Sequence, residues 1–361
     1  MKICTIVGAR PQFIKVSPVS RTIKTAGHNE ILIHTGQHYD HRMSQVFFDE
    51  LGIKEPDINM EIGSGSHAEM TAKMLIGVER IILEHNPDWV LVYGDTNSTL
   101  AGALAAVKLH IPIAHVESGL RSFNRRMPEE INRIVADSVS DILFAPTQDA
   151  AKNLANEGIP ARRVHLVGDV MYDAVLLHGS KADRESKILN ALGLESGKFV
   201  LSTVHRAENT DELNRINAII GGLSKLAKEI PVVLPLHPRT REALKRCSLL
   251  ETAKRNLKLI EPVGYLDMIK LEKSAALIAT DSGGVQKEAF FQRIPCVTLR
   301  DETEWVELVE MGWNSLCPPT GAEHIAEALR SMIGVVGRDE HPYGDGNASE
   351  KIARILTETQ C

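Results

Sequence analysis

Short apolar runs rich in β-branched residues alternate along the chain with longer stretches in which apolar positions recur at helical spacing. Such runs predict buried strands, and their alternation with helices predicts right-handed crossovers and parallel sheets. The first series comprises Ile3–Val7, Ile31–Ile33, Trp89–Tyr93, Ile113–Val116, Ile142–Ala145 and Val164–Val167. The second comprises Phe199–Val204, Val232–Leu236, Leu257–Ile260, Leu277–Ala279 and Cys296–Leu299. We therefore predict an α/β protein with two doubly wound sheets.

The two series are separated by a charged stretch, around residues 168–197, that lacks the strand pattern. A chain of 361 residues also exceeds the size at which a single hydrophobic core keeps growing. We therefore predict two Rossmann-like domains, residues 1–169 and residues 170–344, that face each other across a cleft.

Composition and charge narrow the classes of partner. The net charge of -6 and the aromatic content of 4% disfavour nucleic acid, which requires a basic face and stacking side chains. The N-terminal apolar stretch is too short for a secretory signal, and no apolar run is long enough to span a membrane. The five cysteines are scattered without a C-x-x-C pair. We expect a cytoplasmic protein whose partners include neither nucleic acid nor a membrane.

Carboxylates follow the predicted strands of the first domain, at the edge where doubly wound sheets bind ligands. Asp95 and Glu117 each follow a strand, and Glu129 and Glu130 begin a predicted helix. Carboxylates that share a cleft have separated proton affinities and can supply both an acid and a base. Arg133 lies four residues after Glu129, so we expect it to pair with Glu129 and orient it. Capping and surface ion pairing are sufficient to explain Glu130.

A glycine turn in the second domain predicts a phosphate-binding cradle. Ser282, Gly283 and Gly284 lie between the strand at Leu277–Ala279 and an amphipathic helix. Glycines let a diphosphate approach the backbone, and the first amides of the helix supply unpaired donors. For an isolated Ser-Gly-Gly, an ordinary strand-to-helix turn is the alternative.

Basic residues lie beside this cradle in the same pattern. His205 with Arg206, and later His237 with Arg239, follow two strands of the second domain. Arg10 and Lys15, at the start of the first helix, are candidate cationic clamps from the first domain. The histidines His34, His38 and His41 have a spacing that fits one helical face only if His34 is helical, and His34 ends a strand. We therefore expect no metal.

Six segments in order resemble the non-hydrolysing UDP-N-acetylglucosamine 2-epimerases. They are residues 8–15 (GARPQFIK), 93–99 (YGDTNST), 115–121 (HVESGLR), 127–133 (MPEEINR), 280–284 (TDSGG) and 342–346 (PYGDG). The resemblance implies a glycosyltransferase-B-like fold, a C-terminal helix at 345–361 that packs back on the first domain, a homodimer, and no cofactor. It also implies elimination of UDP to 2-acetamidoglucal and its re-addition with the opposite configuration at C2.

The resemblance assigns site residues by motif. The catalytic set is Asp95, Glu117, Glu129, Arg133 and His205. The set that binds the UDP-sugar is Arg10, Lys15, His237, Ser282, Gly283, Gly284, Arg300 and the ribose-binding Glu288. The expected product from UDP-N-acetylglucosamine is UDP-N-acetylmannosamine.

Three departures from the family pattern keep alternatives open. Gln12 stands where family members commonly have glutamate, and Trp305 stands where they have a nucleotide-contacting arginine. Both variants resemble a sister group acting on UDP-2,3-diacetamido-2,3-dideoxyglucuronate, which is the alternative substrate. Lys73 replaces an arginine of a second, activating site, which disfavours activation by substrate. A glycosyltransferase of the same fold and a non-catalytic UDP-sugar sensor are further alternatives.

Overall fold

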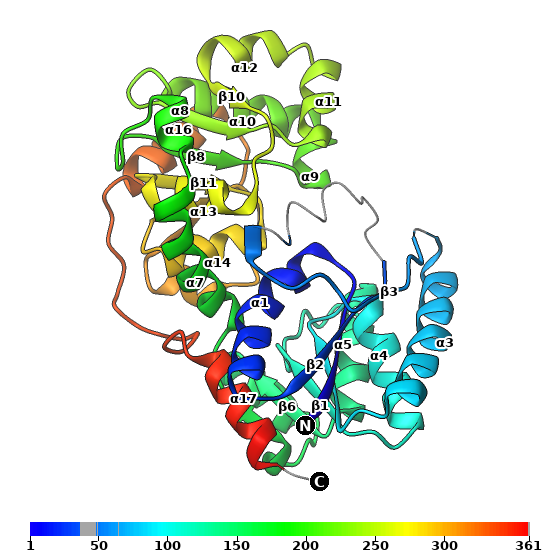
Figure 1. Cartoon of the computed structure of the whole chain (residues 1–361). Coiled ribbons are helices and arrows are strands. Elements are labelled where there is room, and N and C mark those ends of the chain that lie inside the picture. The colour runs from blue at the N-terminus through cyan, green and yellow to red at the C-terminus, as the bar shows by residue number, and fades with distance from the viewer. Residues whose placement is uncertain (37–47, 49, 64, 360–361) are drawn as a thin grey trace. The chain divides into compact units, whose positions relative to one another are not determined.

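The computed structural model describes residues 1–36, 48, 50–63 and 65–359, except for the side chain of Arg10. The chain divides into two compact units (Figure 1). Unit 1 comprises Met1–Leu177 and His341–Cys361, and unit 2 comprises His178–Glu340. The predicted boundary at residues 169/170 coincides with the start of α7 (Val170–Glu185), and the chain passes from unit 1 to unit 2 within this helix.

Unit 1 is built on a parallel sheet in which the strand order is β3-β2-β1-β4-β5-β6-β7. Its strands are β1 (Lys2–Val7), β2 (Asn29–His34), β3 (Ile58–Asn59), β4 (Trp89–Tyr93), β5 (Ile113–Val116), β6 (Ile142–Ala145) and β7 (Val164–Leu166). The order reverses between β1 and β4, which is the switch point at which Rossmann sheets bind ligands.

The helices of unit 1 connect these strands as crossovers. They are α1 (Arg10–Thr25), α3 (His67–His85), α4 (Asn97–Lys108), α5 (Pro128–Val139) and α6 (Gln148–Asn156), with the short 3-10 turn η1 (Ala161–Arg163). The C-terminal helix α17 (Ala348–Glu358) packs along α1 (Figure 1). Its N-terminus is capped from α7, because the Asp173 carboxylate accepts the backbone N–H of Ser349 at 2.7 Å and that of Ala348 at 3.1 Å.

Unit 2 repeats the same topology with a parallel sheet ordered β10-β9-β8-β11-β12-β13. Its strands are β8 (Val200–Thr203), β9 (Val232–Pro235), β10 (Lys258–Ile260), β11 (Leu277–Thr280), β12 (Cys296–Thr298) and β13 (Asn314–Leu316). Its helices after α7 are α8 (Ile188–Leu192), α9 (Ala207–Thr210), α10 (Leu213–Leu226), α11 (Pro238–Arg246), α12 (Leu250–Asn256), α13 (Tyr265–Ser274), α14 (Gly283–Phe291), α15 (Val306–Glu310) and α16 (Ala322–Met332). The switch point of this sheet lies between β8 and β11.

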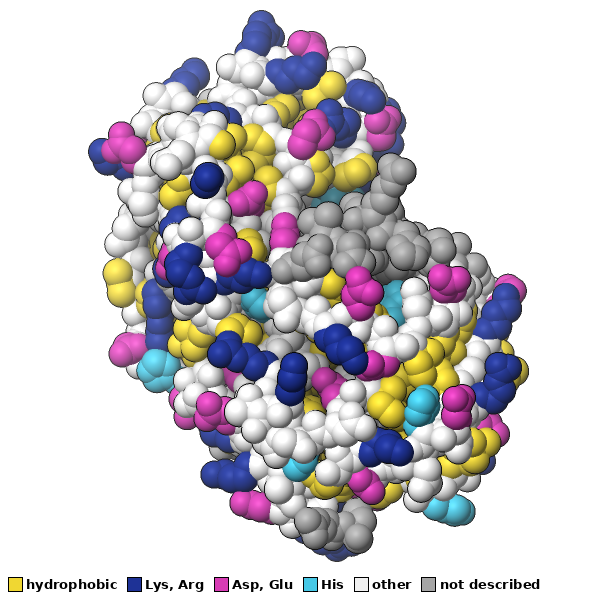
Figure 2. Space-filling view, viewed as in Figure 1, with side chains coloured by type: hydrophobic (Ala, Val, Ile, Leu, Met, Phe, Trp, Pro, Cys, Tyr) yellow, Lys and Arg dark blue, Asp and Glu magenta, His cyan; other side chains and the backbone are white. Residues whose placement is uncertain are grey.

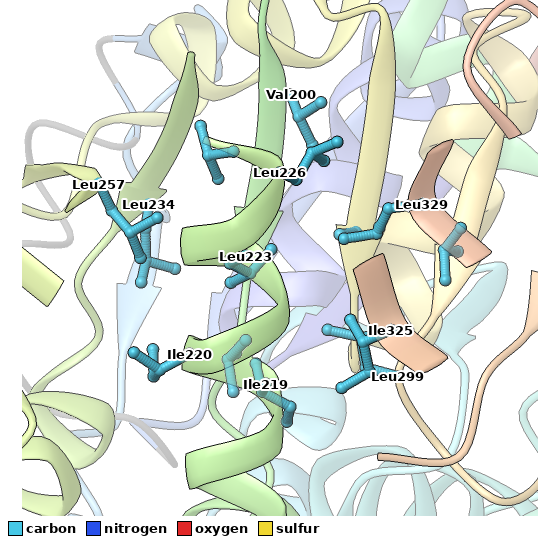
Figure 3. Close-up of a cluster of buried hydrophobic side chains, with 14 of the residues drawn as sticks. Val200, Ile219, Ile220, Leu223, Leu226, Leu234, Leu257, Leu299, Ile325 and Leu329 are labelled. Atoms are coloured by element: carbon cyan, nitrogen blue, oxygen red, sulfur yellow. The ribbon is translucent and has the colours of Figure 1, made fainter. Parts of the chain in front are cut away.

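The larger core of unit 2 forms around α10. Figure 3 shows Ile220 on the side of Leu234 and Leu257, while Ile325 and Leu329 of α16 lie on the other side of α10. The two helices approach closely because Gly222 lacks a Cβ, which would otherwise meet the side chain of Ile325 at 2.6 Å. Burial of these aliphatic side chains holds β8 and β11 beneath the helices.

The predicted fold class is confirmed, and every predicted strand is present with its ends shifted by a few residues at most. The strands that were not predicted are β3 and β13, which form one edge of each sheet. On the face shown in Figure 2, Lys and Arg side chains are interspersed with Asp and Glu side chains. Among the described residues, we find no helix with the length and apolarity needed to cross a bilayer.

Candidate active site

The switch point of unit 1 is held together by Gln12. Its Oε1 accepts the backbone N–H groups of Gly8 and Ala9, at 2.8 and 3.0 Å, and its Nε2 donates to the carbonyl of Tyr93 at 2.7 Å. The side chain is 2% exposed. It therefore fixes the end of β1 against the end of β4, the strand that precedes Asp95. This positioning role was not predicted, because only the folded sheet brings the two strand ends together.

Asp95 is presented beyond β4 and is bound by Arg133 from α5. Its carboxylate is 32% exposed, so a ligand can reach it. The backbone carbonyl of Asp95 accepts a hydrogen bond from Asn132 Nδ2 at 2.8 Å. The loop that carries Asp95 is therefore fixed while the carboxylate stays accessible.

The predicted pairing of Arg133 with Glu129 is wrong. Arg133 Nη1 instead donates to Glu130 Oε2 at 2.9 Å, and Glu129 is exposed at the start of α5. Glu130 is 1% exposed rather than on the surface, and its carboxylate also accepts the N–H groups of Ser122 and Phe123. Although burial raises the pKa of Glu130, hydrogen bonds from Ser122 and Arg133 hold it below its ordinary value. Arg133 pairs with Glu130 and not with Glu129 because the buried Glu130 carboxylate is fixed beside it.

Glu117 follows β5 in a left-handed backbone conformation, with φ of +67°. This conformation costs a non-glycine residue about 1–2 kcal/mol, and such strain concentrates at functional sites. Its carboxylate is 9% exposed and forms an ion pair with Lys15 of α1. Lys15 was predicted as a cationic clamp, and in this structure its charge is matched by Glu117.

A buried network on α5 supports both carboxylate loops. Asp137 Oδ1 contacts His115 Nδ1 at 2.7 Å, and Asp137 Oδ2 binds Arg121 at 2.8 Å and the N–H of Gly119 at 3.0 Å. His115 Nε2 contacts the carbonyl of Gly94 at 2.7 Å. Burial raises the pKa of Asp137, but His115 and Arg121 outweigh it and hold the pKa low. Asp137 was not predicted, because its partners His115, Arg121 and Gly119 come beside it only in the folded chain.

The switch point of unit 2 is organised by Asp281, which follows β11. Its carboxylate is fully buried and accepts the backbone N–H groups of His205 and Arg206 at 3.0 Å each, and Asn209 Nδ2 at 3.1 Å. The end of β8 is thereby fixed to the end of β11. Asp281 was noted in the motif but not predicted as a positioning residue.

The two predicted histidines of unit 2 lie side by side. The ring of His205 is 40% exposed, and its centroid is 5.5 Å from that of His237. His237 Nδ1 accepts the N–H of Arg239 and so caps α11. Burial, and then the neighbouring His205, lower the pKa of His237. The two imidazole rings place nitrogen atoms that can donate hydrogen bonds beside the end of β8.

The predicted cradle begins α14, where Ser282 is the N-cap. A Cβ on Gly284 would meet nothing closer than Ser282 Oγ at 3.9 Å, so this glycine faces open space. A Cβ on Gly283 would instead overlap Oε1 of Glu304. Trp305 Nε1 donates to the carbonyl of Gly283 at 2.9 Å. In this structure the missing Cβ of Gly283 therefore accommodates Glu304.

The remaining predicted residues have the following surroundings. Arg300 is 7% exposed and is bound by Glu304 at 2.7 Å and Glu208 at 3.2 Å. Glu288 is 8% exposed on α14. Lys73 is exposed and pairs with Glu69. The side chain of Arg10, and the residues His38 and His41, lie outside the described part of the chain.

Among the residues that the structure describes, no three His, Cys, Asp or Glu side chains form a group that could hold a metal ion. His34 Nδ1 contacts Asn59 Oδ1 at 3.1 Å and packs against Phe13, which is a structural environment.

Two parallel sheets in Rossmann strand order, each with fixed polar groups at its switch point, place the protein in the class of α/β folds that bind ligands at such points. The chain belongs to the UDP-N-acetylglucosamine 2-epimerase family, whose model matches residues 21–357. The predicted family is confirmed.

Its relatives include proteins of two stated activities. A protein of Methanococcus maripaludis named UDP-N-acetylglucosamine 2-epimerase homolog is 53% identical over 99% of both chains. The UDP-2,3-diacetamido-2,3-dideoxy-D-glucuronate 2-epimerase of Pseudomonas aeruginosa is 52% identical, also over 99% of both. The crystal structure of Methanocaldococcus jannaschii UDP-GlcNAc 2-epimerase with UDP-GlcNAc and UDP is 44% identical, with a TM-score of 0.87 over 99% of this chain and 100% of that one.

Proposed function

We propose that this protein epimerises C2 of a UDP-2-acetamido sugar and converts UDP-N-acetylglucosamine to UDP-N-acetylmannosamine. The observation that carries the proposal is the pair of carboxylates, Asp95 and Glu117, held by dedicated networks at the switch point of unit 1. The glycine turn of unit 2 also supports the proposal as a candidate phosphate site, because Gly284 faces open space. The Methanocaldococcus jannaschii relative, whose crystal structure is with UDP-GlcNAc and UDP, supports this substrate class.

The chemistry requires a base, a leaving-group site and an acid. A carboxylate removes the C2 proton while the C1–O bond breaks, and the bonding electrons leave with the diphosphate of UDP. The product is 2-acetamidoglucal, with a C1–C2 double bond. UDP then adds back to C1 as a proton is delivered to the opposite face of C2. The reaction sequence involves no net oxidation or reduction, so it requires no redox cofactor.

Each predicted site residue has a role in this scheme. We propose that the residues acting at the sugar are Asp95, Glu117 and Glu129, with Arg133 positioning Asp95. We propose that the nucleotide is held by Arg10, Lys15, His205, His237, Ser282, Gly283, Gly284, Arg300 and the ribose-binding Glu288. The first α14 amides and the Arg and Lys side chains of this set would stabilise the charge that develops on the departing diphosphate.

The test is the reaction in deuterated water. Wild-type protein incubated with UDP-N-acetylglucosamine should exchange the C2 proton for deuterium and form UDP-N-acetylmannosamine. Asp95→Asn should lower kcat about 100-fold or more, because it removes an acid–base group. Asp149→Asn is the matched control, since Asp149 is 79% exposed on α6. Recovered sugar nucleotide without deuterium at C2 would rule the proposal out.

A second substrate is favoured by a specific relative. The Pseudomonas aeruginosa protein, 52% identical, is named for UDP-2,3-diacetamido-2,3-dideoxy-D-glucuronate. Gln12 and Trp305 are the variants that suggested this sister group. Product NMR with each sugar nucleotide in separate reactions gives two kcat/KM values, and the larger identifies the substrate.

Two other functions of the same fold give different results in these assays. A glycosyltransferase would need an acceptor and would leave C2 unexchanged. A UDP-sugar sensor would bind UDP-N-acetylglucosamine without turnover, and Asp95→Asn would change nothing catalytic. C2 exchange without an acceptor therefore excludes both.

We also propose that the protein is a cytoplasmic homodimer. The family resemblance supports the dimer, and the free thiols of Cys4, Cys247, Cys296 and Cys317 are compatible with a reducing compartment. Size-exclusion chromatography with light scattering should give twice the 39.7 kDa mass of one chain. A mass of one chain at micromolar concentration would contradict the dimer.

A further inference from the structure

The N-terminus of α14 already contacts an anion, the side chain of Glu304. Oε1 of Glu304 occupies the space that a Cβ on Gly283, the first residue of α14, would fill. A helix N-terminus carries partial positive charge and unpaired N–H groups, so it attracts negative charge. The carboxylate therefore stands beside Gly283, one of the two glycines of the predicted phosphate site, while the space at Gly284 stays open.

The cations around this point are matched by the same carboxylate. Glu304 Oε2 accepts from Arg300 Nη1 at 2.7 Å, and Glu304 Oε1 lies 3.7 Å from Arg206 Nη2. The other side of the Arg300 guanidinium contacts Glu208 at 3.2 Å. Partial burial raises the pKa of Glu304, but a backbone hydrogen bond and Arg300 outweigh it and keep the pKa low. Glu304 is therefore a charged anion at neutral pH.

A diphosphate bound at the same helix start would meet this carboxylate at contact distance. Like charges at that separation repel, so the two anions do not share the site. The Glu304 side chain is 43% exposed and can turn into solvent without burying its charge. The adjacent Trp305 is anchored, because its indole donates to Gly283 and the Lys287 ammonium lies 4.4 Å from its ring centroid. The movement therefore needs only the side chain of Glu304.

We propose that the diphosphate of a nucleotide replaces Glu304 at the start of α14, so that Glu304 lowers affinity for the diphosphate and favours its release. This inference rests on the proposed function, which places UDP at this cradle. The exchange leaves Arg300 and Arg206 with an anionic partner in both states. It makes Glu304 an affinity-determining residue that acts through competition with the ligand's phosphates.

A purely supporting role for Glu304 predicts the opposite sign. If Glu304 served to orient Arg300 toward the phosphates, removing its charge would weaken binding of UDP. If it accepted hydrogen bonds from the nucleoside, removing its charge would weaken binding of uridine as well. The sign of the change in affinity therefore separates the proposal from both roles.

The experiment compares UDP and uridine binding by calorimetry at low salt for wild-type protein, Glu304→Gln and Glu302→Gln. Glu302 is exposed two residues earlier and gives the same change in net charge. We expect Glu304→Gln to lower the Kd for UDP about twofold to fivefold, the range for loss of one exposed ionic competitor, and to leave the Kd for uridine unchanged. Glu302→Gln should change neither.

An unchanged or raised Kd for UDP in Glu304→Gln overturns the inference while UDP binding by the wild type upholds the nucleotide site. Failure of the wild type to bind UDP overturns the proposed function itself. A crystal structure of the wild-type protein with UDP gives a second test that needs no variant. It should show the Glu304 carboxylate turned away from Gly283, and a carboxylate that remains there beside bound UDP refutes the exchange.

Discussion

Glu272 should destabilise the folded protein at neutral pH, and its replacement by methionine should stabilise it. The side chain is 1% exposed near the end of α13, and neither carboxyl oxygen has a hydrogen-bond partner among the described residues. Burial, and then the charge of Glu288, raise the pKa of Glu272 well above its ordinary value. Between its ordinary pKa and the raised folded value, Glu272 therefore binds more protons in the folded state than in the unfolded state.

The magnitude follows from this linkage. The protonated Glu272 carboxyl makes its full contribution to the free energy of unfolding below the ordinary pKa of 4.5. This contribution is lost as the pH rises from 4.5 toward the raised pKa of Glu272 in the folded state. Each pH unit in that window removes about 1.4 kcal/mol from the free energy of unfolding. The loss accumulates at this slope only between the two pKa values, and Glu272→Met has no such dependence.

Urea denaturation of wild type and Glu272→Met at pH 5, 6 and 7, followed by tryptophan fluorescence, measures the difference. We expect Glu272→Met to be the more stable protein at pH 7, with an advantage that shrinks as the pH is lowered. Glu251→Met, at a side chain 76% exposed on α12, is the control and should show no pH-dependent advantage. A constant difference across the three pH values, or a destabilised Glu272→Met at pH 7, would refute the reasoning.

Three further perturbations test other parts of the structure. Burial lowers the pKa of His178 to about 4, so the stability that the neutral imidazole contributes is fully present above pH 6.5. About 3 kcal/mol of the free energy of unfolding is then lost between pH 6.5 and pH 4. A histidine NMR resonance that is assigned through His178→Asn and titrates near 6.5 would contradict this. Asp173→Ala should cost about 1–2 kcal/mol and speed amide exchange in α17, and unchanged exchange there would argue against the cap. Gly119→Ala should lower both stability and turnover, because its Cβ would overlap the carbonyl of Ala150. Gly158→Ala is the control, since Gly158 has a φ of +82° and open space around it, so that thermal unfolding of this variant measures the backbone strain alone. Equal effects of the two substitutions on stability would show that the clash at Gly119 contributes nothing.

The fold was predictable because its central strands are buried on both faces. Trp89–Tyr93 is buried at all five positions, so its sequence is a continuous apolar run. The two edge strands that were not predicted lack that signal, since Ile58–Asn59 is two residues long and Asn314–Leu316 begins and continues with polar residues. Their pairing depends on neighbouring strands and not on local pattern.

The positions of the site residues were predictable, but their partners were not. A residue within two positions of the end of a buried parallel strand lies at the ligand edge, which is sufficient to select Asp95 and His205 as candidates. Gln12 and Asp281 form hydrogen bonds with residues 81 and 76 positions away in sequence, so their roles appear only after folding. The i, i+3 and i, i+4 partners of Arg133 were both within reach, and burial of Glu130 decided between them.

The surroundings of Gly283 and Gly284 depend on the requirements of the unliganded protein as well as on those of the ligand. A largely buried guanidinium such as Arg300 is costly without a counter-charge, and that cost applies whether or not a nucleotide is bound. Glu208 and Glu304 provide that counter-charge in this structure. Under the proposed function, Gly283 would admit a carboxylate from its own chain in the unliganded state and a phosphate in the liganded state. Its lack of a Cβ would serve both states, while the open space at Gly284 would be available to the nucleotide.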